Sequence, residues 1–389
     1  MRRYHDSFAM KESSIQSIST TRPHRQAFAV ATLLVLWTCW ASPASAAERR
    51  TENVLLVTYD GLRRQELFAG ADESLLNREH GGVRDVDALR ARFWSDDPLR
   101  RREALLPFFW SVVAQQGQVF GASDAGSSVR GTNGLYFSYP GYNEILSGVA
   151  DARIDSNAKR PNPNLTVLEA LHRKPSLSGR IAAFASWDVF PFILNEETTG
   201  IPVNAGWELL EYASPQSRMA ELNALAAEIP HYWSNVRYDL FTFEGSLGYL
   251  EQRKPRLLYV AFGETDDWAH DGRYDLYLES ARRTDDYIRR LWEALQSLPE
   301  YAGKTSLILA SDHGRGAGLE DWRRHGKDVP GSELTWIAVI GPDTPPLGIR
   351  ANTGVTQGQV AASVAALLGY DFLEDSPAAA PALPGLLQE

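Results

Sequence analysis

The sequence predicts an α/β fold, a three-layer sandwich in which helices flank a largely parallel central sheet. The first observation is a recurring apolar run of strand length, which is typical of parallel strands buried on both faces. The second is that segments with helical spacing separate most of these runs, the alternation expected of α/β proteins. The five runs are Asn53–Thr58, Ile181–Ala185, Leu257–Phe262, Ser306–Ala310 and Trp336–Ile340.

The clearest helix is predicted between the third and fourth runs. From Tyr277 to Leu298, apolar residues fall near helical intervals among charged ones. The chain shows neither an internal repeat nor a low-complexity linker, so residues 47–375 are predicted to form a single domain. Within it, residues 191–248 lack a regular alternation of strand-like and helix-like segments. We predict that they form a cap insertion. The Pro- and Ala-rich tail, residues 376–389, is expected to be loose.

The first 46 residues have the order of a secretory signal peptide. Arg22 and Arg25 precede an apolar run from Ala27 to Trp40, and Ala44-Ser45-Ala46 follows it. The run is shorter than the roughly 20 residues that a bilayer span needs, so we expect no stable membrane anchor. We expect cleavage near Ala46 and a periplasmic or secreted protein.

Composition and charge limit the classes of partner. The sole cysteine, Cys39, lies in the leader, so the mature chain has no disulfide, and its about 340 residues can bury a core without one. The whole chain carries a formal charge of −10, and removal of the leader makes it −13. We therefore expect no nucleic acid partner. Nothing in the sequence indicates an oligomeric state.

Metal-ligand types follow three of the five apolar runs. Asp60 comes after the first, Asp266 after the third, and Asp312 with His313 after the fourth. In doubly wound sheets, ligands bind beyond the carboxyl ends of the strands. An acidic residue and a histidine exposed together at the end of a buried strand are costly to desolvate unless something pairs them, as a metal does.

Two further histidines complete the candidate set. His270 follows Asp266 by four residues, which places both side chains on one face of a helical turn, although Asp267 is an equal candidate for the carboxylate. His325 stands twelve residues after His313. Three carboxylates and three imidazoles without a thiolate favour zinc, with manganese as the second choice. A pair of such ions can activate a nucleophile and stabilise the leaving oxygen of a displacement at phosphorus.

Taken in order, these motifs resemble those of a known family over Val54–Pro342. The motifs are Val54-Leu55-Leu56-Val57-Thr58-Tyr59-Asp60-Gly61, Ser138-Tyr139-Pro140-Gly141, Asp266-x-x-x-His270, Asp312-His313-Gly314 and His325-Gly326. The sequence resembles the alkaline phosphatase superfamily, in particular its type I phosphodiesterase and nucleotide pyrophosphatase branch.

The resemblance implies an alkaline-phosphatase-like fold and an exported phosphoesterase that hydrolyses small phosphate mono- or diesters with two metal ions. Ser138 would be the nucleophile and would form a phosphoseryl intermediate. Asn157 is the nearest candidate to hold a nonbridging phosphate oxygen, with Asn164 behind it. The implied ligands are Asp60, Asp312, His313 and the oxygen of Ser138 for one metal, and Asp266, His270 and His325 for the other.

The sequence departs from the family pattern and leaves two alternatives open. Gly141 stands where the family commonly has an asparagine, so that part of the motif does not transfer. Ser138-x-Pro140 begins like a sulfatase signature, but Tyr142 stands where that signature needs an arginine. The sulfatase reading also calls for a single calcium ion and a carboxylate-rich site. The other alternative is a noncatalytic periplasmic binding protein that retains the fold.

Overall fold

The computed structural model describes residues 49–210 and 216–388. The predicted signal peptide, its cleavage site near Ala46 and Cys39 lie outside the described residues. Within the described ranges, no helix combines the length and the apolar character that a membrane crossing requires.

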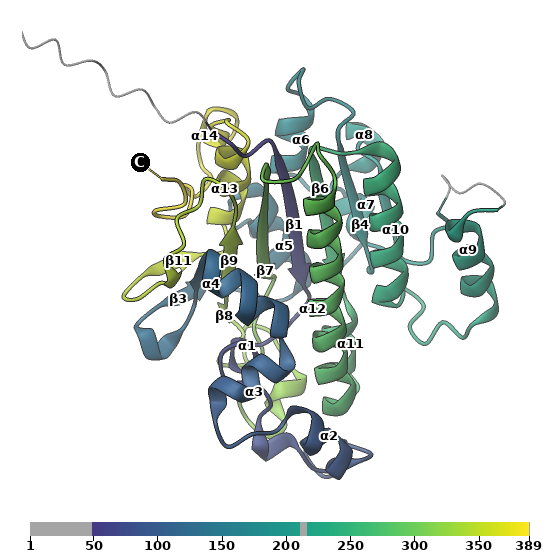
Figure 1. Ribbon diagram of the computed structural model, residues 1–389, viewed down its shortest axis with the longest axis vertical. Coiled ribbons are helices and arrows are strands. Elements are labelled where there is room, and N and C mark those ends of the chain that lie inside the picture. Colours follow the sequence, from purple (N-terminus) through teal and green to yellow (C-terminus); the bar gives the residue numbers. More distant parts are fainter. Residues whose placement is uncertain (1–48, 211–215, 389) are drawn as a thin grey trace, which may run out of the picture. The chain divides into compact units, whose positions relative to one another are not determined.

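An eight-stranded sheet forms the centre of the structure (Figure 1), with strand order β10-β2-β9-β7-β1-β6-β4-β5. All five predicted runs lie in this sheet, and the strands from β7 to β5 pair in parallel. β9 pairs antiparallel with β7. The parallel pairings from β7 to β5 confirm the prediction of a largely parallel sheet. The strands are β1 (Asn53–Tyr59), β2 (Gln118–Phe120), β4 (Ile181–Ala185), β5 (Val203–Ala205), β6 (Leu257–Phe262), β7 (Thr305–Ser311), β9 (Ile337–Ile340) and β10 (Gly348–Ile349).

Helices cover both faces of the sheet, as predicted. Along β1, Leu55 and Val57 belong to one hydrophobic core, whereas Val54 and Leu56 belong to the other. The first core is closed by α10 (Asp239–Arg253) and α12 (Tyr274–Ser297), and the second by α5 (Ser138–Ser147), α6 (Val167–His172) and α13 (Gln359–Leu367). Figure 1 shows α10 and α12 in front of the strands and α5 behind them.

The remaining elements are short. A second sheet has the order β11-β3-β8. Its strands are β3 (Ser128–Arg130), β8 (Leu334–Thr335) and β11 (Gly354–Thr356). The other helices are α1 (Arg64–Ala69), η1 (Glu73–Leu75), α2 (Val86–Phe93), α3 (Pro98–Leu105), η2 (Phe109–Val113), α4 (Ala114–Gln116), η3 (Ser123–Ala125), α7 (Phe190–Ile193), α8 (Glu196–Thr199), α9 (Arg218–Glu228), α11 (Glu264–His270), η4 (Asp321–Arg323) and α14 (Phe372–Asp375).

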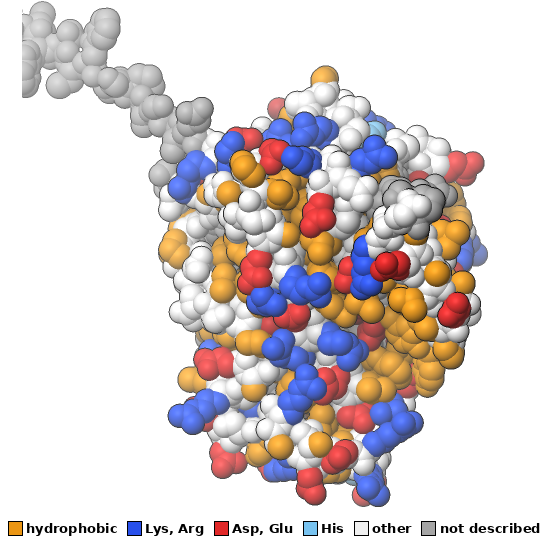
Figure 2. All heavy atoms as spheres, turned by 45° about the vertical axis from the view of Figure 1, so that its right-hand side comes forward, with side chains coloured by type: hydrophobic (Ala, Val, Ile, Leu, Met, Phe, Trp, Pro, Cys, Tyr) orange, Lys and Arg blue, Asp and Glu red, His pale blue; other side chains and the backbone are white. Residues whose placement is uncertain are grey.

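The segment predicted as a cap, residues 191–248, is not a separate insertion. Its β5 pairs with β4 in the central sheet, and its α10 packs against the sheet because Phe243 and Leu250 are core residues. The stretch between them exposes apolar side chains, including Leu225 and Tyr232. Figure 2 shows hydrophobic side chains gathered at the right of this face, whereas positive and negative side chains are intermixed over the rest.

The expectation of a loose tail from Ser376 is wrong for the described residues. Leu383 and Leu386 are buried, and both belong to the second core. The Leu383 N–H donates to the Ser363 hydroxyl at 2.9 Å, and the Gln118 amide donates to the Gly385 carbonyl at 2.6 Å. The leucines within this Pro- and Ala-rich stretch bury apolar surface, and this burial holds the tail against the second core.

Asp285 supports the loop that follows β1 through a chain of contacts. Its buried carboxylate accepts the backbone N–H groups of Phe108 at 2.8 Å and Phe109 at 2.9 Å. The Phe109 ring packs edge-on against Trp336, with ring centroids 5.8 Å apart. The Trp336 indole N–H donates to the Leu62 carbonyl at 3.0 Å, two residues after Asp60. This loop is therefore anchored through the first hydrophobic core to α12.

The titration of Asp285 gives a test of this anchor. Burial raises the pKa of Asp285 to about 7, although the two N–H donors favour its ionised form. The unfolded value is about 3.9, so the stability that the proton contributes is complete below about pH 4 and is lost as pH rises through 7. We predict that the wild type loses stability relative to Asp285→Asn over this range. Urea unfolding at several pH values measures the difference, and a pH-independent difference would contradict the prediction.

Candidate active site

The carboxyl ends of three adjacent strands bring the predicted ligands together. β1 lies between β7 and β6 in the sheet. Asp60 directly follows β1, Asp312 and His313 directly follow β7, and α11 begins two residues after β6 and carries Asp266. Because parallel strands end at the same edge, these side chains lie at one place, as the sequence predicts.

The first cluster consists of Asp60, Asp312 and His313. The His313 Nε2 atom lies 3.3 Å from Asp60 Oδ1 and 3.4 Å from Asp312 Oδ2. All three side chains are buried. The Ser138 hydroxyl, at the first residue of α5, lies 3.5 Å from the same His313 nitrogen. Four of the predicted site residues thus face one point.

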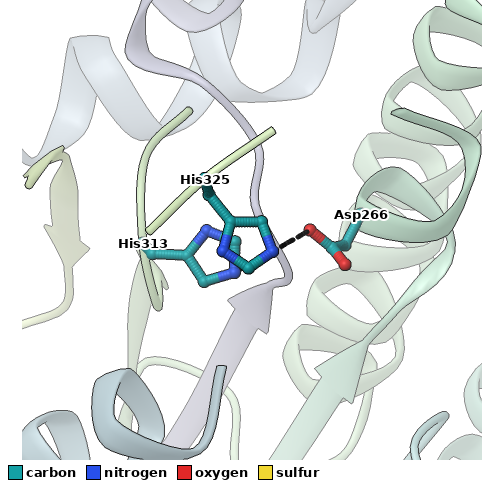
Figure 3. A group of neighbouring side chains, drawn as sticks. All are labelled: Asp266, His313 and His325. Carbon is teal, nitrogen blue, oxygen red and sulfur yellow. Dashed lines mark ion pairs between the residues drawn. The ribbon is translucent and has the colours of Figure 1, made fainter. Parts of the chain in front are cut away.

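The second cluster consists of Asp266, His270 and His325. The His270 Nε2 atom lies 3.2 Å from Asp266 Oδ2 and 3.0 Å from His325 Nε2. His325 Nε2 lies 3.6 Å from Asp266 Oδ1. Figure 3 shows Asp266 reaching from its helix towards His313 and His325. The clusters meet there, because His313 Nε2 lies 3.8 Å from Asp266 Oδ1.

The donor atoms of both clusters fit divalent cations. Asp60 Oδ1 and Asp312 Oδ2 are buried and have no hydrogen-bond partner among the described residues. The Nδ1 atom of His313 lies 2.9 Å from the Gly314 carbonyl, and that of His325 lies 3.2 Å from the Tyr136 carbonyl. A proton on each Nδ1 would donate to these carbonyls and leave Nε2 as the ligand atom. The orphaned oxygens, together with the Nε2 atoms of His313 and His325, suit a metal centre.

The electrostatics of the site also call for cations. Burial raises the pKa of Asp60, and burial with the neighbouring Asp60 carboxylate raises that of Asp312 well above its usual value. Burial opposes a charge on His313, but Asp312 and Asp60 raise its pKa to about 9. Burial beside Asp266 raises the pKa of Asp267 to about 9. Bound metal ions would offset this concentration of negative charge.

The guanidinium of Arg315 offsets part of this negative charge at the second cluster. Its buried guanidinium contacts the Asp266 carboxylate, and its Nε donates to the Trp322 carbonyl at 2.9 Å. Burial disfavours the Asp266 anion, but His270 and Arg315 hold the pKa of Asp266 well below its usual range. Gly61 has a φ of 58°, and a Cβ there would lie 2.8 Å from both Arg315 Nη1 and Asp266 Oδ1. The glycine that ends the first motif therefore admits this ion pair.

The departure at Gly141 has a steric cause. A Cβ at this position would lie 2.3 Å from the backbone oxygen of Asp312. α5 thus packs directly against the loop that carries Asp312, and an asparagine would not fit between them. This close approach brings Ser138 to the first cluster.

Tyr142 is a site residue that the sequence did not identify. Its hydroxyl donates to Asp60 Oδ2 at 3.0 Å, one turn of α5 after Ser138. Burial keeps the pKa of Tyr142 well above its usual value, so the phenol remains a donor. The hydrogen bond orients the carboxylate whose other oxygen faces His313. Its only signal in the sequence was its place in the Ser138 motif.

Glu144 is a second residue that the sequence missed. Its buried carboxylate accepts the N–H groups of Thr132 at 2.9 Å and Asn133 at 3.1 Å, and the Asn133 amide at 2.9 Å. Asn133 in turn accepts the Tyr136 N–H at 2.8 Å. The Tyr136 carbonyl is the partner of His325 Nδ1. Glu144 therefore positions both the loop that leads into Ser138 and the ring of His325.

A cavity of about 400 Å³ opens over both clusters, and Ser138 and Asn157 line it together. Asn157 Oδ1 accepts the Tyr139 N–H at 3.0 Å, so its amide nitrogen remains as a donor. The other candidate, Asn164, donates to Asn143 Oδ1 at 3.0 Å and is not among the lining residues. The geometry favours Asn157 of the two.

The family model of the type I phosphodiesterase / nucleotide pyrophosphatase family matches residues 75–353. The chain belongs to this family. The resemblance to this branch of the alkaline phosphatase superfamily is thereby confirmed. Membership makes the chain a phosphoester or sulfate ester hydrolase of that superfamily.

Solved structures of low identity share the fold of this chain. Ps i-CgsB has a TM-score of 0.52 at 14% identity, and the match covers 85% of this chain and 75% of that one. Murine ectonucleotide pyrophosphatase / phosphodiesterase 5, solved as an inactive variant with AMP, has a TM-score of 0.50 at 12% identity, with 87% and 100% covered. No curated protein matches the chain.

Tyr142→Phe tests the support of the first cluster. Loss of the hydroxyl frees Asp60 Oδ2, and such outer hydrogen bonds affect metal affinity by about 10–100-fold. We predict weaker zinc binding at the first cluster with little loss of stability, measured by competition with a chromogenic chelator. Tyr259→Phe is the matched control, because that buried hydroxyl pairs with Thr58 at 3.0 Å. Equal affinities in both variants would contradict the role of Tyr142.

Asn133→Ala tests the path from Glu144 to His325. The substitution removes the acceptor of the Tyr136 N–H and leaves Glu144 buried with its other donors. We predict that metal affinity falls at the second cluster by about tenfold and stays unchanged at the first. Metal titration followed by calorimetry resolves the two events. An equal loss at both clusters would indicate a general structural effect instead.

Proposed function

We propose that the chain is an exported phosphoesterase that uses two divalent ions, zinc or as second choice manganese, to hydrolyse phosphate mono- or diesters through Ser138. The observation that carries the proposal is the position of the Ser138 hydroxyl, which faces the meeting point of two clusters rich in metal-ligand types. One cluster would hold a cation with Asp60, Asp312, His313 and the Ser138 oxygen, and the other with Asp266, His270 and His325.

The residues of the site have separate roles in the proposed reaction. Divalent ions, when bound, favour the ionised form of the Ser138 hydroxyl and offset negative charge on the oxygens around phosphorus. Ser138 Oγ forms a bond to phosphorus, and the bond from phosphorus to the leaving alcohol oxygen breaks. The Asn157 amide holds a nonbridging oxygen, and the N-terminus of α5 favours the anionic group. Water then cleaves the phosphoseryl ester and restores Ser138.

The histidine content of the site favours this proposal over the sulfatase alternative. Three imidazoles suit zinc better than calcium, which prefers oxygen ligands. Tyr142 occupies the position of the sulfatase arginine, and it is buried with its hydroxyl on Asp60. We also propose that the leader of residues 1–46 directs export and that the mature chain from residue 47 acts as one hydrolase domain. All seven predicted positions keep suitable residue types, which argues against a noncatalytic binding protein.

Ser138→Ala separates catalysis from metal binding. We predict that it abolishes release of 4-nitrophenol from mono- and bis-4-nitrophenyl phosphate, because the nucleophile is gone, while about two metal ions per chain remain. His325→Ala is the matched comparison and should lose the second ion. Metal analysis and turnover are measured together. Activity in Ser138→Ala would overturn the mechanism, and turnover of the sulfate analogue with one calcium ion would favour the sulfatase reading.

A further inference from the structure

The cavity over the clusters extends beyond the candidate metal ligands. Its volume of about 400 Å³ is more than a phosphate group alone fills. The part away from the clusters, here called the outer end, has both polar and apolar walls. It is lined by Lys159, Trp187, Asp188, Val189, Asn235 and Val236.

An ion pair defines the polar side of the outer end. Lys159 Nζ lies 2.7 Å from Asp188 Oδ2. The Asp188 backbone is held in place because its N–H donates to the Asn235 carbonyl at 2.9 Å and Trp187 forms a β-bridge with Val236. The other carboxylate oxygen, Asp188 Oδ1, is buried without a hydrogen-bond partner among the described residues. A rigid acceptor thus stands beside a paired cation.

The charges of the outer end disfavour a second anion. Among the described residues that line the cavity, Lys159 is the only lysine or arginine, and Asp188 already neutralises it. A second phosphate there would have to break this pair and would face the Asp188 carboxylate. A neutral hydroxyl group meets no such cost. It can donate to the Asp188 carboxylate, which lines the cavity, and accept from Lys159.

We propose that the outer end binds a neutral organic group with several hydroxyls, such as a glycerol or sugar residue, esterified to the phosphate. The preferred substrate would then be a polyol phosphodiester rather than an ester with a second phosphate. The apolar side chains of Trp187, Val189 and Val236 provide contacts for the carbon skeleton. This inference rests on the proposed function.

Three diesters with the same leaving group test the inference. They are the 2,3-dihydroxypropyl, propyl and 2-phosphoethyl esters of 4-nitrophenyl phosphate, and the metal-loaded protein is assayed with each. We expect kcat/KM for the dihydroxypropyl ester to exceed that for the propyl ester by about tenfold, because hydroxyl-binding groups are left unpaired by the propyl ester. The 2-phosphoethyl ester should be the poorest substrate.

Asp188→Asn should lower the preference for the hydroxylated substrate over the charged one. The substitution leaves Lys159 without its counter-ion, so kcat/KM should rise for the 2-phosphoethyl ester and fall for the dihydroxypropyl ester, each by about fivefold. Asp375→Asn is the matched control, because Asp375 pairs with Lys174 at 2.8 Å outside the cavity. It should leave all three values unchanged, and thermal melting verifies that both variants fold.

The outcomes separate this inference from the proposed function. Equal kcat/KM for the dihydroxypropyl and propyl esters, or a preference of the wild type for the 2-phosphoethyl ester, would overturn the polyol site while phosphodiesterase activity stands. Unchanged selectivity in Asp188→Asn would also overturn it. If the metal-loaded wild type cleaves none of the diesters and no monoester, the proposed function fails and the polyol site fails with it.

Discussion

The repulsion among buried carboxylates at the end of β1 is the constraint on which the site depends. Asp60, Asp312 and the partly buried Asp266 converge around His313, and the burial of Asp60 and Asp312 deprives these two of the water that would screen their charges. Arg315 neutralises Asp266 alone, through the gap that Gly61 leaves. Burial, together with the negative charge that remains, raises the pKa values of Asp60 and Asp312. Such a cluster is stable as a set of anions only with cations bound, which ties the fold of this edge to the chemistry proposed for it.

α5 places the candidate nucleophile, Ser138, beside this cluster of charges. The helix packs against the Asp312 loop at Gly141, and this contact sets the distance between Ser138 and His313. Tyr142, one turn later, fixes Asp60, and Glu144 reaches back to the loop whose carbonyl orients His325. One helix therefore presents the nucleophile and orders a ligand of each cluster. A shift of this helix would displace Ser138, Tyr142 and Glu144 together. The helix residues are buried throughout, and this packing restrains such a shift.

The sequence predicted the parts of the molecule that depend on local patterns. Apolar runs identified the five main strands because a strand buried on both faces needs no polar position. The positions of the candidate ligands were predictable because these residues directly follow strands such as β1 and β7. The roles of Tyr142 and Glu144 depend on partners far along the chain, and nothing near them marks those partners. β5 has only three residues, so the edge of the sheet was read as part of a cap, and Leu383 and Leu386 were too few to show that the tail packs.

Local sequence patterns are also insufficient to predict substrate specificity. The candidate ligands stand in short motifs at strand ends, but the group beyond the phosphate would meet residues from three separate loops. Lys159 follows α5, Asp188 follows β4, and Asn235 precedes α10, so no motif joins them. The positive charge of Lys159 is offset locally because its amine lies 2.7 Å from the Asp188 carboxylate. The choice between an anionic and a neutral substrate group is therefore set by a tertiary contact, and it can differ between relatives that share every metal ligand.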